Sequence, residues 1–288
     1  MWVVFALLSA LFAGITAILS KIGIQKTDSP LATALRTVVV LLFSWALVFA
    51  QGLQAQLGAI SAHTYLFLAL SGLATGASWL CYFHALKLGT VNQVVPVDKS
   101  STVLTMLLAF VLLGEPIGWL KGVCIVLIAL GTWLMIEKKP QSASQTVKTG
   151  NGWLLFALLS AVFAALTAIL GKIGIQGVPS DLGTAIRTIV VLVMSWMIVF
   201  LRGKQKEIGQ IDRKSAAFIV LSGVATGLSW LCYYRALQDG LASVVVPLDK
   251  LSIVVTIAFS YLFLHEKLSK KALLGFILIV AGTALLLL

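Results

Sequence analysis

Ten long apolar segments, separated by short polar stretches, account for most of this chain. They lie at residues 2–24, 31–50, 65–86, 91–113, 117–136, 153–175, 182–201, 216–237, 242–264 and 268–288. Each is close to the ~20 residues that an α-helix needs to cross the hydrocarbon core of a bilayer. Most are apolar on every side and lack the alternation of a barrel strand. The pattern therefore predicts an all-α polytopic membrane protein with ten transmembrane helices.

The second half of the sequence repeats the first. Residues 2–137 align with residues 153–288 at a constant offset of 151 and without a gap, and about half of the aligned residues are identical. Five apolar segments per copy is an odd number, so the second copy must be inverted if every segment crosses the membrane. Inverted repeats are typical of alternating-access carriers. We expect three regions: a five-helix repeat at 1–137, a polar linker at 138–151 and an inverted five-helix repeat at 152–288.

The composition agrees with a membrane protein and gives no indication of a disulfide, metal or cofactor site. Hydrophobic residues make up 60% of the chain, too much apolar surface for a soluble domain of 288 residues to bury. The first segment has no preceding positive charge and recurs inside the chain, so we expect a retained span rather than a signal peptide. The three cysteines, Cys81, Cys124 and Cys232, lie within apolar segments and form no disulfide or metal pattern. We expect neither a metal nor another cofactor.

The net charge of +11 is distributed unevenly between the loops. The odd-numbered loops between segments hold nearly all the loop lysines and arginines, so the positive-inside rule places them in the cytoplasm and both termini outside the cell (inner) membrane. The loop at 51–64 has no lysine or arginine, whereas its equivalent at 202–215 has five. This asymmetry would orient two similar halves in opposite senses. Because the charges sit in short loops, we expect no nucleic-acid partner.

Two adjacent charged pairs lie inside apolar segments at matched positions of the copies: Asp98 with Lys99, and Asp249 with Lys250. Ionisable groups are costly there and typical of functional sites. They predict a half-site in each repeat for a polar or zwitterionic substrate, with Asp98 and Asp249 as proton carriers if transport is coupled. The alternative is an ion pair that only sets helix packing. Adjacent helical residues diverge by about 100°, so we do not expect Asp98 and Lys99 to neutralise each other.

Further matched polar residues accompany these pairs. Pro96 and Pro247 remove a backbone donor, which predicts either a helix break that supplies ligand groups or a plain kink. One end of the third and eighth segments carries substrate-binding candidates, which are Ser78, Trp79, Tyr82, Ser229, Trp230 and Tyr233. A short loop brings this end beside the charged pairs, so Trp79 and Asp98 would line one pocket with the indole closing over the substrate. An interfacial aromatic belt or ordinary packing is the alternative.

Arginines in the second and seventh segments, Arg36 and Arg187, are also substrate-binding candidates. Snorkelling to the interface or a buried ion pair would explain them equally well. For Lys21 and Lys172, near the ends of the first and sixth segments, we favour snorkelling.

Two features predict helix contacts rather than a site. Glu115 and Glu266 end the fourth and ninth segments, where an acid typically caps a neighbouring helix N-terminus. Small residues in the fifth and tenth segments predict that these two helices pack on each other. They are Gly118, Gly122, Gly131, Gly275 and Gly282.

Taken together, the chain resembles the EamA-type ten-span carriers of the drug/metabolite transporter superfamily. The resemblance covers both halves and rests on the duplicated five-span plan and a few motif residues. These are Arg36 and Arg187, Pro96 and Pro247, the LGE of residues 113–115, and Gly131 in the glycine-rich fifth span. Each half also resembles the short single-copy EamA proteins, which share the VVPxDK pattern.

The resemblance implies helices packed as a basket around a central cavity, with the last span of each half forming a pseudo-dimer seam. It also implies export or import of amino acids, other metabolites or drugs. The second copy departs from the pattern at His265, Lys267 and Leu273, which replace Gly114, Pro116 and Gly122. These departures weaken the packing expected for that half. Ten-span members are usually taken to have cytoplasmic termini, whereas the local charges here favour external ones.

The function predicted from the sequence is secondary active transport of a small polar metabolite, an amino acid or related zwitterion, by alternating access. Its partners would be the lipid bilayer, the small-molecule substrate and, if coupled, a proton; a monomer and a homodimer are both compatible with the repeat. Proton-coupled efflux of cationic drugs is the rival within transport, but the first and sixth segments lack the acid that small multidrug resistance carriers use. A non-transporting scaffold or regulatory subunit is the rival from another class. An enzyme is not expected, since no HExxH motif, nucleophile elbow or Gly-rich phosphate loop is present.

Overall fold

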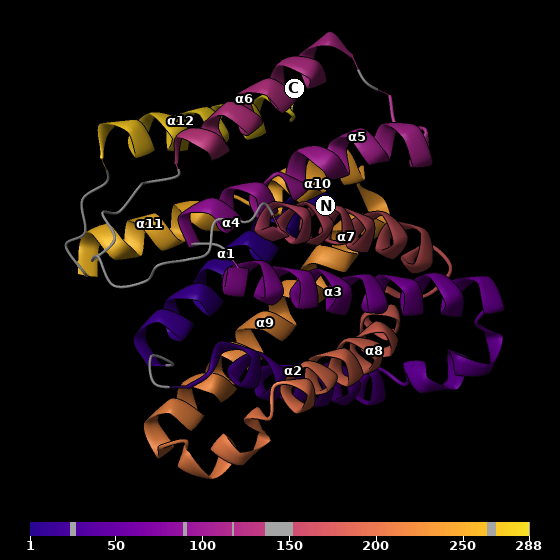
Figure 1. Ribbon diagram of the computed structural model, residues 1–288. Helices are drawn as coiled ribbons and strands as arrows, with labels where there is room; N and C mark the ends of the chain where they lie inside the picture. Colours follow the sequence, from indigo (N-terminus) through magenta and orange to yellow (C-terminus); the bar gives the residue numbers. More distant parts are fainter. Residues whose placement is uncertain (24–26, 89–90, 117, 136–151, 264–268, 288) are drawn as a thin grey trace.

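The computed structural model describes residues 1–23, 27–88, 91–116, 118–135, 152–263 and 269–287 (Figure 1). The first half forms α1 (Trp2–Gly23), α2 (Ser29–Ala50), the 3₁₀ helix η1 (Leu53–Ala59), α3 (Ala62–Leu88), α4 (Val91–Lys99), α5 (Ser101–Leu113) and α6 (Trp119–Leu134). The second half forms α7 (Gly152–Ile175), α8 (Ser180–Leu201), η2 (Lys204–Gln210), α9 (Arg213–Asp239), α10 (Ala242–Asp249), α11 (Ser252–Phe263) and α12 (Lys270–Leu285). No strand occurs within these ranges, which confirms the predicted all-α fold.

The helices match the predicted spans closely enough to establish a polytopic membrane protein. In the described chain, seven helical segments are long and apolar enough to cross a bilayer, and α6 is a shorter apolar helix. Two short 3₁₀ helices were not predicted. The loops after α2 and α8 each form a 3₁₀ helix, which begins after a glycine with positive φ, Gly52 at 70° and Gly203 at 67°.

The fourth and ninth spans are broken, where the sequence predicted one continuous helix for each. The first half passes from α4 to α5 at Ser100, and the second from α10 to α11 at Lys250 and Leu251. At the second break the Lys250 N–H donates to the Pro247 carbonyl at 3.1 Å, and the Leu251 N–H to the Leu248 carbonyl at 3.0 Å. These tight i→i+3 turns lie three residues after Pro247, which cannot donate to the helix ladder itself.

Each half packs its third helix against the second helix of the other half through glycine. A Cβ at Gly72 of α3 would lie 2.8 Å from the Cβ of Val190 in α8, and one at Gly223 of α9 would lie 2.6 Å from the Cβ of Val39 in α2. Glycine is needed there because the helices approach too closely for a methyl group. The repeated SG(L/V)ATG motif is therefore explained by helix packing.

The predicted contact between the fifth and tenth spans is confirmed, but by fewer glycines than expected. A Cβ at Gly131 of α6 would lie 2.6 Å from the carbonyl oxygen of Gly275 in α12, and one at Gly282 would lie 3.0 Å from the Cβ of Leu127. Gly118 and Gly122 have no neighbouring atom within 4 Å at this position, so the GxxxG spacing that begins the helix does not form the seam. Figure 1 shows α6 and α12 side by side at one edge of the molecule.

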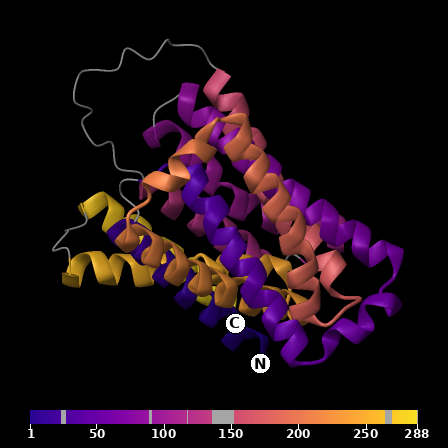
Figure 2. The ribbon, with the colours of Figure 1, turned by 90° about the horizontal axis from the view of Figure 1, so that it is seen from below.

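The two halves interleave rather than forming separate bodies. α1 packs along α9 and α3 along α7, as the mixed colours of Figure 2 show. Equivalent helices that meet, α6 with α12 and α2 with α8, run antiparallel: Gly131 faces Gly275, whereas Gly282 faces Leu127. An approximate two-fold rotation that reverses helix direction relates the halves. This reversal supports the expectation that the second copy is inverted in the bilayer.

Candidate functional site

The carboxylate of Asp249 is held by two serines between the halves. Ser9 of α1 donates from its Oγ to Oδ1 of Asp249 at 2.6 Å. The Oγ atoms of Ser9 and Ser229 lie 3.3 Å apart, and Ser229 of α9 also donates to the backbone carbonyl of Ser9 at 3.1 Å. The end of α10 is thus linked to α1 of the other half through a hydrogen-bonded cluster.

Asp98 has the same environment, related by the two-fold. Ser160 of α7 donates to Oδ1 of Asp98 at 2.7 Å, and Ser78 donates to the Ser160 carbonyl at 3.0 Å. Sequence reasoning proposed Ser78 and both aspartates but missed Ser9 and Ser160. The available signal was that a serine recurs at this position in the first helix of both copies.

A polar cavity of about 310 Å³ lies between the halves. Elements of both repeats line it, including α3, α7, α9 and α10. The predicted site residues found in its wall are Ser78, Trp79, Arg187, Ser229, Trp230, Tyr233, Asp249 and Lys250. Thr75, Ser101, Thr105, Thr167 and Tyr234 also line it and were missed. The structure therefore brings together matched residues that lie far apart in the sequence.

A second cavity of about 220 Å³ adjoins the first and contains Arg36. It shares the two indoles, Trp79 and Trp230, and the Ser229 side chain with the larger cavity. Asp98, Lys99 and Tyr82 are not among the residues that line these two cavities, so the pocket predicted between Trp79 and Asp98 stays a prediction.

Three further candidates are described by their place in the helices. Tyr82 packs instead in an apolar cluster with Leu86 and Trp153. Pro96 lies within α4, and its counterpart Pro247 lies inside α10, two residues before Asp249.

Arg187 is the most deeply buried cation of this site, with 2% of its surface exposed. Its Nε donates to the Ser71 Oγ at 2.9 Å, and its Nη2 donates to the Thr75 hydroxyl. The guanidinium carbon lies 4.9 Å from the ring centre of Tyr234 and 5.4 Å from that of Trp230, within the range of cation–π contacts. Of the readings left open for this residue, snorkelling to the interface does not fit, because its partners hold it inside the protein.

Arg36 repeats part of this arrangement. Its Nε donates to the Ser222 Oγ at 3.2 Å, the equivalent of the bond from Arg187 to Ser71. Its Nη2 donates to the Ser20 Oγ at 2.7 Å, a contact with no counterpart because Gly171 occupies the matching position. Arg36 is also less completely buried than Arg187.

The charged pair of the second repeat does not show the divergence expected of adjacent residues in a helix. Nζ of Lys250 lies 3.7 Å from Oδ2 of Asp249, so these adjacent residues do form an ion pair. The expectation of divergent side chains assumed a continuous helix. α10 instead ends at Asp249, and Lys250 lies in the turn, where its side chain is free to fold back.

Two other polar residues serve helix ends. The Glu115 carboxylate, 5% exposed, accepts from the N–H groups of Ala242 at 2.6 Å and Ser243 at 2.9 Å, so it caps α10 of the other half as predicted. Lys172 is 9% exposed and donates to backbone carbonyls at the end of α9, including Gly240 at 2.8 Å, so its expected snorkelling is wrong. Glu266 and the side chain of Lys21 lie outside the described part of the structure.

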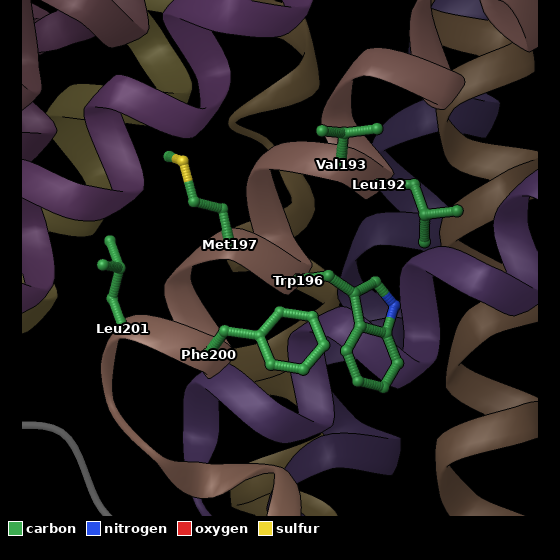
Figure 3. Close-up of a pocket in the computed structure, with 6 residues that line it drawn as sticks. All are labelled: Leu192, Val193, Trp196, Met197, Phe200 and Leu201. Atoms are coloured by element: carbon green, nitrogen blue, oxygen red, sulfur yellow. The ribbon is translucent and has the colours of Figure 1, made fainter.

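A third hollow lies on the surface of α8. It measures about 630 Å³ and is lined by apolar side chains of α8 alone, which are Leu192, Val193, Trp196, Met197, Phe200 and Leu201 (Figure 3). Phe200 and Leu201 are 60% and 72% exposed. Exposed apolar side chains on a membrane helix fit contact with lipid tails, and this hollow offers no group to orient a polar ligand.

The fold and the interior charges define a membrane transport protein, and comparison with known proteins agrees. The model of the EamA-like transporter family matches residues 1–137 and again 151–288. The chain belongs to this family, as the sequence resemblance suggested.

Its relatives include single and double copies of the repeat. An uncharacterised transporter in the cobO 3′ region of Sinorhizobium sp is 48% identical over 136 residues, which is 47% of this chain and 96% of that protein. The uncharacterised transporter sll1164 of Synechocystis sp. is 26% identical over 219 residues, covering 70% of this chain and 59% of that one. A crystal structure described only as that of a protein matches the fold with a TM-score of 0.80 at 16% identity, over 99% of this chain and 96% of the other.

Proposed function

We propose that this membrane transporter is a secondary active carrier that moves a small polar metabolite, an amino acid or related zwitterion, across the cell membrane by alternating access. The observation that carries the proposal is the 310 Å³ cavity between the halves, where Arg187, Asp249 and Lys250 face one enclosed space. Charged groups are costly inside a membrane protein and typically mark a substrate pathway. The volume lies at the lower end of the roughly 300–1,000 Å³ of small-molecule sites.

The wall offers complementary groups for a zwitterion. The Arg187 guanidinium suits a carboxylate, and the Asp249 carboxylate suits an ammonium group. Between them the indoles of Trp79 and Trp230 supply flat apolar surfaces that exclude water from the polar contacts. A scaffold or regulatory subunit would have no use for such a cavity.

The two-fold arrangement supports alternating access. Each aspartate is bound by a serine from the first helix of the opposite half, through Ser9 or Ser160, so the two clusters span the junction between halves. Both lie beside a break in the fourth span of their repeat, where a hinge is geometrically available. In the proposed cycle one cluster opens while its equivalent stays closed, which exposes the cavity to each side in turn.

Counterflow in proteoliposomes tests the transport function. Vesicles would be preloaded with unlabelled amino acids or nucleobases, and uptake of the labelled compound followed. We expect flux for one class of compound and its loss in Asp249→Asn, with Asp239→Asn at the exposed end of α9 as a matched control. Absence of flux for every compound would contradict the proposal.

Proton coupling is a separate part of the proposal, with Asp98 and Asp249 as the carriers. A proton gradient should then drive uptake in the native protein but not in the double variant Asp98→Asn/Asp249→Asn. Gradient-driven flux that survives in the double variant would remove both aspartates from this role.

A further inference from the structure

Cations outnumber carboxylates in the two cavities between the halves. Their walls contain Arg187, Lys250 and Arg36 but only one acidic residue, Asp249. Because Lys250 pairs with Asp249 at 3.7 Å, the excess resides on the two arginines.

Arg187 has no opposite charge to neutralise it. Within the described chain its hydrogen-bond acceptors are the hydroxyls of Ser71 and Thr75, and no carboxylate oxygen lies within 4 Å of it. Hydroxyl groups and aromatic faces orient a guanidinium but leave its full charge. A buried charge without a counter-charge is destabilising. A ligand that brings a negative charge into the cavity would remove this penalty.

The guanidinium of Arg187 keeps hydrogen-bond donors available for such a ligand. The Nε and Nη2 atoms point to the two hydroxyls, and no described residue accepts from Nη1. The stacked rings of Trp230 and Tyr234 hold the guanidinium plane in place. A positioned arginine of this kind is suited to a carboxylate, which it binds through parallel hydrogen bonds.

Arg36 presents the same chemistry in the adjoining cavity. Its hydrogen-bond partners, Ser222 and Ser20, are again neutral hydroxyls. The two cavities share Trp79 and Trp230 in their walls, so the two guanidinium groups, which come from opposite halves, line adjoining cavities.

We propose that the substrate is a small organic anion with more carboxylates than amino groups, and that Arg187 and Arg36 are its specificity-determining residues. This inference rests on the proposed transport function and narrows its substrate class. One carboxylate binds Arg187, Arg36 attracts a second, and an amino group, where present, contacts Asp249. A cationic drug meets two like charges and is rejected, which disfavours multidrug efflux.

Ligands of one size and different charge provide the test. Aspartate, asparagine and 2,4-diaminobutyrate share a four-carbon skeleton but are anionic, neutral and cationic, and succinate is a dianion without an amino group. Binding to the purified full-length protein would be followed by tryptophan fluorescence, since Trp79 and Trp230 line both cavities. We expect aspartate or succinate to bind at least ~10-fold more tightly than asparagine, and 2,4-diaminobutyrate most weakly.

Substitutions of Arg187 then test whether the anion binds at this residue. Arg187→Gln should weaken binding of the anion by ~10-fold or more and reduce the preference for the anion over asparagine. Arg187→Lys should retain part of the affinity and part of the preference. Arg213→Gln removes the same charge from an exposed position of α9 and should change neither the affinity for the anion nor the preference over asparagine.

The possible outcomes separate this inference from the transport proposal. Equal or tighter binding of asparagine or 2,4-diaminobutyrate, or no binding of aspartate and succinate at millimolar concentration, would overturn the anion preference. Counterflow of asparagine alone would do so while leaving transport intact. Anion binding that depends on Arg187 without any counterflow would support the preference and remove the carrier.

Discussion

At the scale of single residues, the two serine–aspartate clusters share a chemistry but differ in their surroundings. Asp249 lines the larger cavity, whereas Asp98 lines neither cavity. The serine donors Ser9 and Ser160 are otherwise equivalent, with hydrogen bonds of 2.6 and 2.7 Å to their carboxylates. The pair therefore offers an internal comparison of an aspartate that lines the larger cavity with one that does not.

Replacing each donor makes this comparison. Ser9→Ala and Ser160→Ala each remove one hydrogen bond to a charged group, so each should lower the free energy of unfolding by about 2 kcal/mol. Ser9→Ala should in addition alter substrate affinity, because Asp249 loses the donor that orients it towards the cavity. Thermal unfolding and counterflow would check these effects. Equal changes in substrate affinity for the two variants would contradict a special role for Asp249.

The sequence indicated which polar residues lie inside the helix bundle, but not which residues they contact. Matched polar residues in apolar segments identified Asp249, Arg187 and Trp230, since a polar group inside a membrane requires a reason. It could not identify Ser9 as the partner of Asp249, because their contact depends on how α1 of one half lies against α10 of the other. Nor could it separate Asp98 from Asp249, since the two copies share the VVPxDK pattern.

At the scale of helices, the glycine contacts between the halves predict which glycine substitutions destabilise the protein. Gly72→Ala would place a methyl carbon 2.8 Å from the Cβ of Val190, and overpacking of this kind costs about 1–3 kcal/mol. Gly122→Ala is the matched control, because it also lies within a helix but has no atom within 4 Å of that methyl position. It should be neutral or stabilising by up to ~1 kcal/mol through helix propensity. Thermal unfolding in detergent would measure both, and equal effects would contradict the close approach of α3 and α8.

The start of α9 should depend on pH through its cap. Asp212 accepts from the Ser215 N–H at 3.2 Å, and hydrogen bonds from the side chain and backbone of Ser215 lower the pKa of Asp212. A lowered pKa means that the cap stabilises the helix above the ordinary pKa of aspartate and is lost as pH falls through the depressed value. The protection factor for hydrogen exchange at the first turn of α9 should therefore fall in acid, and Asp212→Asn should remove this dependence while retaining the cap. An unchanged acid response in that variant would assign it to another group.

Helix boundaries show where sequence reasoning at this scale stops. Apolar length located each span but predicted one helix for residues 242–264, which the structure divides at Lys250 and Leu251. Pro247 indicated a disturbance there, yet the helix continues past it to Asp249 before it breaks. The position of the break depends on tertiary contacts such as the bond from Ser9 to Asp249, which are not local properties of the chain.

At the scale of the whole molecule, duplication and an odd number of spans predicted inversion, and the antiparallel packing of α6 on α12 supports it. The interleaving of the halves was not predicted, since composition and periodicity do not specify which helices pair. It has a functional consequence, because the cavity is lined by both copies and neither half encloses it alone. Any motion of one half against the other must then change access to the arginines and Asp249 together.

The remaining question at this scale is the orientation of each half in the bilayer, which the loop charges predict. The equivalent loop helices η1 and η2 should lie on opposite sides, with η1 outside and the basic η2 in the cytoplasm. Gly58 and Gly209 occupy matched, exposed positions in them, with no atom within 4 Å of an added Cβ. In a background with its native cysteines replaced by serine, a membrane-impermeant maleimide should label Gly58→Cys in intact cells but label Gly209→Cys only after permeabilisation. The reverse pattern would place both termini in the cytoplasm and keep the inversion, whereas labelling of both from one side would exclude the inversion itself.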